Sequence, residues 1–148
     1  RIASYVGHNM LFSSEEQAID NLHALSSGFG PHTKQQWEAL CLPMLRKGPN
    51  GMFRLHYDPA IAAPMQSMTE ELSRRSTEIL WSVYDGIQAQ TLLIRGVLSD
   101  LITAETARHM QSRGPCAQCI ELEGVGHAPT LVANEQVAIA RNFLLGDE

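Results

Sequence analysis

The feature that most restricts the fold of this sequence is the regular alternation of helix and strand patterns after residue 75. Apolar residues at helical spacing alternate there with two short strand-like runs. In chain order the expected elements are a helix over residues 77–84, a strand over 91–95, a helix from a Thr103 cap to about Arg113, a strand over 117–122 and a helix from an Asn134 cap. This order predicts neighbouring parallel strands joined by helical crossovers.

Two strands are too few for a finished sheet of this kind. An isolated parallel pair leaves both of its edges unpaired, and parallel sheets are normally buried on both faces. The remaining strands must therefore come from elsewhere. We expect the strand over residues 91–95 to meet another chain segment, either a missing N-terminal half or a symmetry mate.

Residues 1–75 carry helical signals joined by turns, without an obvious long strand. Ser13 with Glu16 has the spacing of a capping box at the start of a first helix, and Thr33 with Gln36 has the same spacing at the start of a second. We therefore predict a mainly helical first region, residues 1–75, followed by an α/β region, residues 76–148.

Composition and charge exclude several classes of protein. The chain has 148 residues, of which 44% are hydrophobic and 18% charged, and its net charge is -5 with scattered arginines, so no basic stripe is present for a nucleic-acid backbone. No apolar run approaches the roughly 20 residues of a membrane span, and residues 1–11 lack a signal-peptide pattern. Three cysteines do not form a disulfide framework. We expect a cytoplasmic protein with neither nucleic acid nor membrane as a partner.

Two residues that can carry chemistry follow the two predicted strands. Asp100 lies in the loop after the first strand, and His127 lies in a glycine-containing loop after the second. Ligands of open α/β sheets bind beyond the carboxyl ends of the strands, so these loops are placed to meet. An aspartate that accepts the Nδ1 proton of a histidine leaves Nε2 free as a base. Spacing alone leaves an alternative open, in which Asp100 caps a turn and His127 is a surface loop residue.

Both segments resemble parts of a known family. Residues 81–100, which end in Thr-Leu-Leu-Ile-Arg-Gly-Val-Leu-Ser-Asp, resemble the region that carries the triad acid in α/β-hydrolases. Residues 120–129, Ile-Glu-Leu-Glu-Gly-Val-Gly-His-Ala-Pro, resemble the strand and loop with the family histidine, and the acid precedes the histidine as in the family. The resemblance implies the C-terminal part of an α/β-hydrolase, with residues 1–75 as its helical cap.

The resemblance also implies what is missing. The family nucleophile lies on a GxSxG elbow, and no such motif occurs in this sequence. We expect the nucleophile upstream of Arg1, and the chain alone to be an inactive fragment. The intact protein is expected to hydrolyse a small apolar ester or a related carbonyl substrate, with Asp100 and His127 in the triad and no metal or organic cofactor.

Other interpretations of the sequence stay open. A non-catalytic binding module on the same scaffold is the alternative function. The cap is expected to offer apolar residues to a substrate, although the same residues are equally typical of an ordinary core; they are Met44, Met52, Phe53, Met65 and Met68. Cys116 and Cys119 form a CxxC pair, but it precedes a strand and no second pair completes a zinc site.

Two other aspartates are rivals for the role of the acid. Asp85 precedes its strand, which puts it at the wrong end of the sheet, and Asp58 is better explained as a turn residue.

Overall fold

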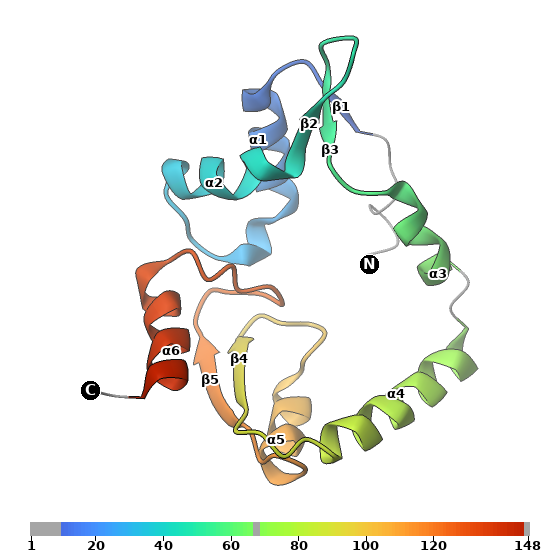
Figure 1. Cartoon of the computed structure of the whole chain (residues 1–148), viewed down its shortest axis with the longest axis vertical. Coiled ribbons are helices and arrows are strands. Elements are labelled where there is room, and N and C mark those ends of the chain that lie inside the picture. Colours follow the sequence, from blue (N-terminus) through green and yellow to red (C-terminus); the bar gives the residue numbers. More distant parts are fainter. Residues whose placement is uncertain (1–9, 67–68, 147–148) are drawn as a thin grey trace. The chain divides into compact units, whose positions relative to one another are not determined.

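The computed structural model describes residues 10–66 and 69–146 (Figure 1). The chain divides into two compact units, and one segment near residue 30 belongs to the second unit although its sequence neighbours belong to the first. The first unit comprises Arg1–Leu25 and Thr33–Glu78, and the second comprises Ser26–His32 and Ile79–Glu148.

The second unit contains the predicted pair of parallel strands. β4 (Leu92–Gly96) pairs with β5 (Gln118–Leu122), and the register runs from Leu92 opposite Gln118 to Gly96 opposite Leu122. The prediction of adjacent parallel strands is therefore confirmed. Because the strands are parallel and paired in register, the loops that follow Gly96 and Leu122 both leave from the carboxyl ends of the strands, at the same end of the sheet.

Helix α4 (Glu70–Asp85) begins in the first unit and ends in the second, and α5 (Ala104–Ser112) and α6 (Asn134–Leu145) belong to the second. Thr103 caps α5 as predicted, with its Oγ1 accepting a hydrogen bond from the Thr106 amide. The predicted Asn134 cap of α6 is wrong by one residue. The N-cap position is Ala133, which has no side chain that can cap, and the Gln136 side chain instead accepts from the Leu131 amide.

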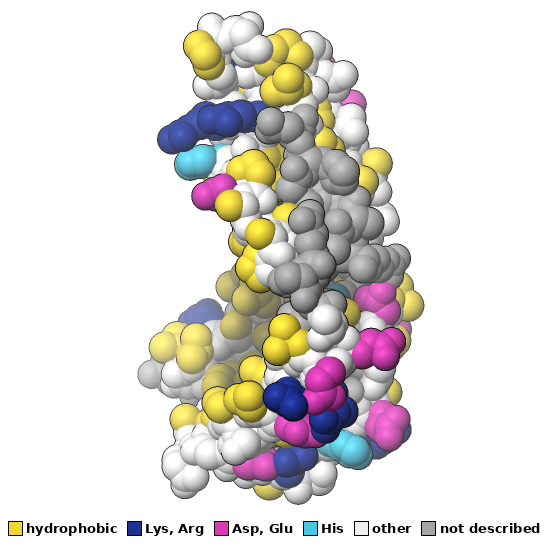
Figure 2. Space-filling view, turned by 90° about the vertical axis from the view of Figure 1, so that its right-hand side faces the viewer, with side chains coloured by type: hydrophobic (Ala, Val, Ile, Leu, Met, Phe, Trp, Pro, Cys, Tyr) yellow, Lys and Arg dark blue, Asp and Glu magenta, His cyan; other side chains and the backbone are white. Residues whose placement is uncertain are grey.

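The helix predicted to begin at residue 77 begins at Glu70, because Thr69 Oγ1 accepts from the Leu72 amide and caps an additional stretch of helix. Arg74 lies within ion-pair distance of both Glu71 and Glu78, and acidic and basic side chains interleave in the lower half of Figure 2. These exposed pairs support the early turns of α4, which the apolar pattern alone did not reveal.

Hydrogen bonds and a cation–π contact join the end of α4 to the end of α5. Arg113 Nε donates to Asp85 Oδ1 at 2.7 Å, and the Arg113 guanidinium lies 4.5 Å from the centre of the Trp81 ring. Tyr84 Oη donates to the Met110 carbonyl at 2.6 Å. Asp85, a rival for the triad acid in the sequence, is thus the partner of an arginine where α4 meets the end of α5.

This ion pair makes a pH-dependent prediction. Through its hydrogen bond and its charge, Arg113 lowers the pKa of the Asp85 carboxyl. A carboxyl whose pKa is lowered by folding stabilises the protein above its unfolded value of about 4, and loses this effect as pH falls through the lowered folded value. We expect Asp85→Asn to reduce the free energy of unfolding near neutral pH but not at an acidic pH below the lowered folded pKa. Urea unfolding at both pH values checks this, with Glu123→Gln, an exposed carboxylate in a turn, as control. An equal deficit at both pH values would contradict the explanation.

The first unit is less helical than predicted. α1 (Glu15–Leu25) and α2 (Lys34–Cys41) lie beside a three-stranded antiparallel sheet in the order β1-β3-β2. The sheet consists of β1 (Leu11–Phe12), β2 (Leu45–Lys47) and β3 (Phe53–Leu55). These strands have two or three residues each; the brief alternation of Phe53 and Leu55 indicates β3, whereas β1 and β2 are too short to show such a pattern. The core of the unit consists of buried residues from the helices and strands: Phe12, Ala18, Leu22, Trp37, Cys41 and Ala62.

Short helices complete this half of the chain. They are 3-10 helices over Ser27–Phe29, Leu42–Met44 and Pro59–Ala62, followed by α3 (Ala63–Gln66). The helix at Pro59 is capped by Asp58, whose Oδ1 accepts from the Ala60 amide at 2.9 Å. Asp58 therefore has the local turn role expected of it. No helix within the described residues is both long and apolar enough to cross a membrane.

One of the two predicted capping boxes is confirmed. In the Thr33 and Gln36 pair, Thr33 Oγ1 accepts from the Gln36 amide and Gln36 Oε1 accepts from the Thr33 amide. The Ser13 and Glu16 box is wrong by one position. Because α1 begins at Glu15, Ser14 Oγ accepts from the Gln17 amide, and Gln17 Oε1 accepts from the Ser13 amide.

Candidate active site

The loop after β4 carries the predicted acid. Beyond Gly96 the chain makes a tight turn, in which the Ser99 amide donates to the Gly96 carbonyl at 3.0 Å. Ser99 Oγ then accepts from the Ile102 amide at 3.1 Å, which closes a second turn around the intervening residues. Asp100 lies within this second turn and its side chain is exposed. The sequence from the end of the strand to Ile102 therefore folds as a compact loop that presents a carboxylate at its surface.

The loop after β5 crosses directly over the end of β4. The Leu98 amide donates to the Val125 carbonyl at 2.9 Å, so the two loops share a backbone hydrogen bond. Gly96 lies under the crossing: a Cβ there would come within 2.0 Å of the Gly126 oxygen and 2.3 Å of the Val125 oxygen. Only glycine permits this approach of two backbones.

The crossing brings His127 to the acid-bearing loop. Nδ1 of His127 lies 3.3 Å from Oγ of Ser99, the residue that directly precedes Asp100, and the imidazole is exposed. Ser99 is a partner that no sequence motif indicated. The predicted hydrogen bond between Asp100 and His127 Nδ1 stays a prediction.

A distant segment supports the histidine loop from another side. The Gly126 amide donates to the Gly28 carbonyl at 2.6 Å. His32 Nδ1 lies 2.8 Å from the Gly30 carbonyl and its Nε2 lies 2.7 Å from Thr130 Oγ1. Since a carbonyl only accepts, Nδ1 carries a proton, and in the neutral ring Nε2 accepts from the threonine hydroxyl. These contacts explain why residues 26–32 belong to the second unit.

The sequence offered no signal for this support, because His32 and Thr130 are 98 positions apart. Neither residue belongs to a recognisable motif. Contacts of this separation depend on how the chain folds back, which local patterns do not report.

Comparisons with known proteins bear on the fold of the chain. No family model matches the sequence. The chain is 37% identical over 149 residues to the 3-hydroxybutyrate-oligomer hydrolase of Cupriavidus necator, covering 99% of this chain and 51% of that protein. A Rickettsia typhi protein classed as a hydrolase superimposes with a TM-score of 0.83 at 24% identity, over 99% of this chain and 48% of the other. An α/β-hydrolase from Novosphingobium aromaticivorans superimposes with a TM-score of 0.77 at 30% identity, over 95% and 49%.

The chain is part of an α/β-hydrolase fold. It matches C-terminal halves of α/β-hydrolases, and it spans about half the length of the proteins that it resembles. The fold class expected from the resemblance is confirmed, and the parallel pair β4 and β5 is its α/β portion.

Within this α/β-hydrolase fold, the CxxC residues are free thiols. Burial, and after it the charge of Glu121, raises the pKa of the Cys119 thiol, so that this cysteine is a weaker nucleophile at neutral pH than an ordinary one. Cys116 is exposed and adopts a positive φ of 50° at the turn before β5. Among the described residues, no group of three or more His, Cys, Asp or Glu side chains could hold a metal ion.

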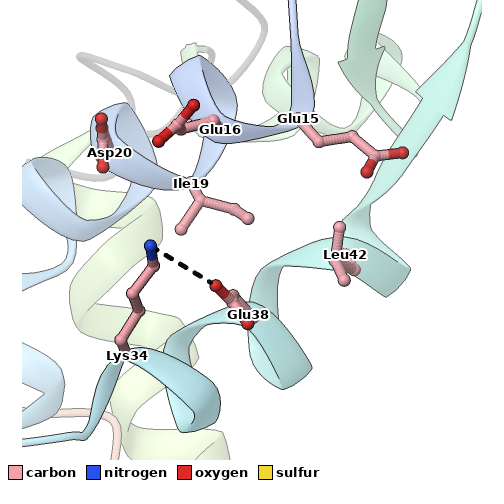
Figure 3. Close-up of a pocket in the computed structure, with 7 residues that line it drawn as sticks. All are labelled: Glu15, Glu16, Ile19, Asp20, Lys34, Glu38 and Leu42. Atoms are coloured by element: carbon pink, nitrogen blue, oxygen red, sulfur yellow. Dashed lines mark ion pairs between the residues drawn. The ribbon is translucent and has the colours of Figure 1, made fainter.

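A hollow in the first unit lies between α1 and α2 (Figure 3). It is lined by Glu15, Glu16, Ile19, Asp20, Lys34, Glu38 and Leu42. Lys34 Nζ lies 4.0 Å from Glu38 Oε1, and both side chains are exposed to solvent. A shallow, mainly acidic surface of this kind is typical of solvated helix faces, and we assign no ligand to it.

Proposed function

We propose that this chain supplies Asp100 and His127 to the catalytic triad of a serine-type ester hydrolase. The nucleophile and the oxyanion hole then belong to the rest of the intact protein, by which we mean this chain together with the half that its relatives have in addition. The observation that carries the proposal is the backbone crossing of the two loops at the carboxyl ends of β4 and β5. This crossing puts the His127 ring 3.3 Å from Ser99, the residue next to Asp100.

The proposed chemistry follows the usual order of acyl transfer. A serine oxygen attacks the carbonyl carbon of the ester while His127 Nε2 takes the serine proton. The tetrahedral intermediate then expels the alcohol, which receives that proton from His127 and leaves an acyl-enzyme. Water repeats the cycle and releases the acid. Asp100 accepts a hydrogen bond from Nδ1–H of His127, which orients the ring and stabilises the imidazolium, and none of these steps uses a metal or an organic cofactor.

The proposed substrates are short oligoesters of a small hydroxy acid. Support comes from the 37% identity to a 3-hydroxybutyrate-oligomer hydrolase over nearly the whole chain. Such oligomers are joined by ester bonds between small, largely apolar units, which fits the small apolar ester expected from the sequence.

The cap stays part of the proposal. We propose that residues 1–75 act as a substrate cap, with Met44 and Phe53 among the residues that contribute apolar surface. Met44 is 45% exposed, whereas Phe53 is partly buried and carries the Lys47 ammonium 5.4 Å from its ring centre. Met52 is partly buried, and the Met65 side chain and Met68 lie outside the described residues.

The missing half is also the proposed partner of the exposed apolar residues in the second unit. Ile79, Leu80 and Val83 of α4 are 64%, 67% and 64% exposed, and Leu98, in the loop that carries Asp100, is 65% exposed. Hydrophobic residues that are clustered and exposed indicate a contact surface. Because the chain spans about half of its relatives, the other half of the α/β-hydrolase is a suitable occupant.

The test compares esters with a matched amide in the intact protein. We expect turnover of the linear 3-hydroxybutyrate trimer and of p-nitrophenyl butyrate, and no measurable turnover of butyryl-p-nitroanilide. Product release is followed by chromatography for the trimer and by absorbance for the aryl substrates.

The alternative function predicts a different result. A non-catalytic binding module would bind the trimer, measured by isothermal titration calorimetry, without hydrolysing it or the aryl ester. Binding without turnover would therefore reject the hydrolase proposal. Turnover of the aryl ester but not of the trimer would reject only the proposed oligoester substrate.

A further inference from the structure

Arg95 is a buried cation that the proposed chemistry does not use. It lies in β4, directly before Gly96, and its side chain is only 6% exposed. Charged side chains are rarely buried to this extent unless each donor is satisfied, since burying an unpaired charge is costly. The groups that satisfy this guanidinium therefore indicate what it holds in place.

Its partners lie at both ends of the acid loop. Nε donates to the Ile102 carbonyl at 2.7 Å, and Nη2 donates to the Val97 carbonyl at 3.2 Å. Nη1 donates to Oε1 of Glu121, the residue opposite Arg95 in β5, at 2.5 Å. One planar group thus joins the first and last residues of the segment from Val97 to Ile102 and ties both to the neighbouring strand.

The chemistry of arginine suits this task. A guanidinium has five N–H donors in a rigid plane, so a single side chain can hold two carbonyls and a carboxylate with fixed geometry. Lysine has one flexible ammonium and cannot reproduce this arrangement. Glu121 is 49% exposed, which means that the ion pair is only partly shielded from water, whereas the two carbonyl contacts belong to the buried guanidinium.

We propose that Arg95 is the positioning residue of the acid loop, an inference that rests on the proposed function. It holds the Val97–Ile102 segment closed, so that Asp100 is presented to His127 with the correct orientation. Arg95 touches neither substrate nor reacting atoms, and it acts through Asp100. Misplacing a catalytic group by about 1 Å can reduce a rate on the order of 100-fold, so a loosened loop should reduce kcat strongly.

The experiment is a double-mutant cycle in the intact protein, with p-nitrophenyl butyrate as substrate. We expect Arg95→Met to lower kcat by about 10- to 100-fold with KM changed by less than about 3-fold. In an Asp100→Asn background the same substitution should lower kcat by less than about 3-fold, because the group that Arg95 positions is already disabled. A role in folding alone would not make the effect depend on Asp100.

Arg113→Met is the matched control. This arginine is also held by a carboxylate in the second unit, but it lies at the contact between α4 and α5. We expect its effect on kcat to be small and to be the same in both backgrounds. Folded fractions are measured for every variant by circular dichroism, so that kcat refers to native protein.

Arg95→Lys keeps the positive charge, and it replaces Arg95→Met in the experiment if that variant does not fold. We expect a smaller loss of kcat and faster amide hydrogen exchange at Ser99 and Ile102, with the same dependence on Asp100. A full Arg95 effect in the Asp100→Asn background would overturn the positioning role while leaving the triad intact. An Asp100→Asn variant with unchanged kcat would instead overturn the proposed function itself.

Discussion

Replacing His127 with alanine in the intact protein is expected to lower kcat/KM for ester substrates by at least about 10,000-fold. The substitution removes the base that takes the proton of the nucleophile and the acid that returns it to the leaving alcohol. The residual rate comes from substrate binding and from an oxyanion hole outside this chain. KM should change little, because His127 contributes to the transition state more than to binding of the ester.

The measurement is the rate of hydrolysis of p-nitrophenyl butyrate at saturating and at limiting substrate concentrations. His109→Ala is the matched control. His109 is an exposed histidine of the same unit; it is on α5, and its ring lies against Trp81 of α4. We expect this control to keep kcat/KM within about 3-fold of the parent protein. Unchanged turnover in His127→Ala would exclude His127 as the base.

Replacing Gly96 with alanine is expected to destabilise the protein by at least about 3 kcal/mol, at the upper end of the usual cost of overpacking. The added Cβ would meet the Gly126 oxygen at 2.0 Å and the Val125 oxygen at 2.3 Å. Both atoms are backbone, so a side-chain rotation cannot relieve the clash. The histidine loop has to lift from the end of β4, which would also separate His127 from Ser99.

The measurement is urea unfolding followed by circular dichroism, together with kcat for the ester. Gly28→Ala is the control: Gly28 contributes its carbonyl to the same crossing, but a Cβ at Gly28 meets no atom within 4 Å. We expect this control to lose less than about 1 kcal/mol. A Gly96→Ala protein as stable as the control would contradict the close crossing of the two loops.

Several features of the chain were predictable because their signals are local. The strands β4 and β5 are short apolar segments ended by turns, and their parallel pairing followed from the helix between them. The Thr103 cap of α5 and the capping box of Thr33 and Gln36 were correct for the same reason. Each depends on residues within one helical turn, where sequence spacing and spatial distance are nearly equivalent.

The errors arose where signals were short or ambiguous. Ser13 and Ser14 are adjacent and both can cap a helix, so the capping box could be placed in either register, and the structure selects Ser14 with Gln17. The strands β1 and β2 are too short to show alternation, and the pairing of β1 with β3 joins residues as far apart as Leu11 and Arg54. The prediction that residues 1–75 are mainly helical was therefore incomplete.

By itself, the sequence determined the order of the α/β elements, the parallel pairing of β4 with β5, and the two loops in which Asp100 and His127 lie. Only the tertiary structure decided that Gly96 passes under the histidine loop, that Ser99 is a partner of His127, and that Arg95 and the segment around Gly28 hold the two loops. The physical reason is the range of the interactions. Secondary structure and caps depend on neighbouring residues, whereas the support of these loops consists of backbone and buried-charge contacts between segments that are brought together only by folding.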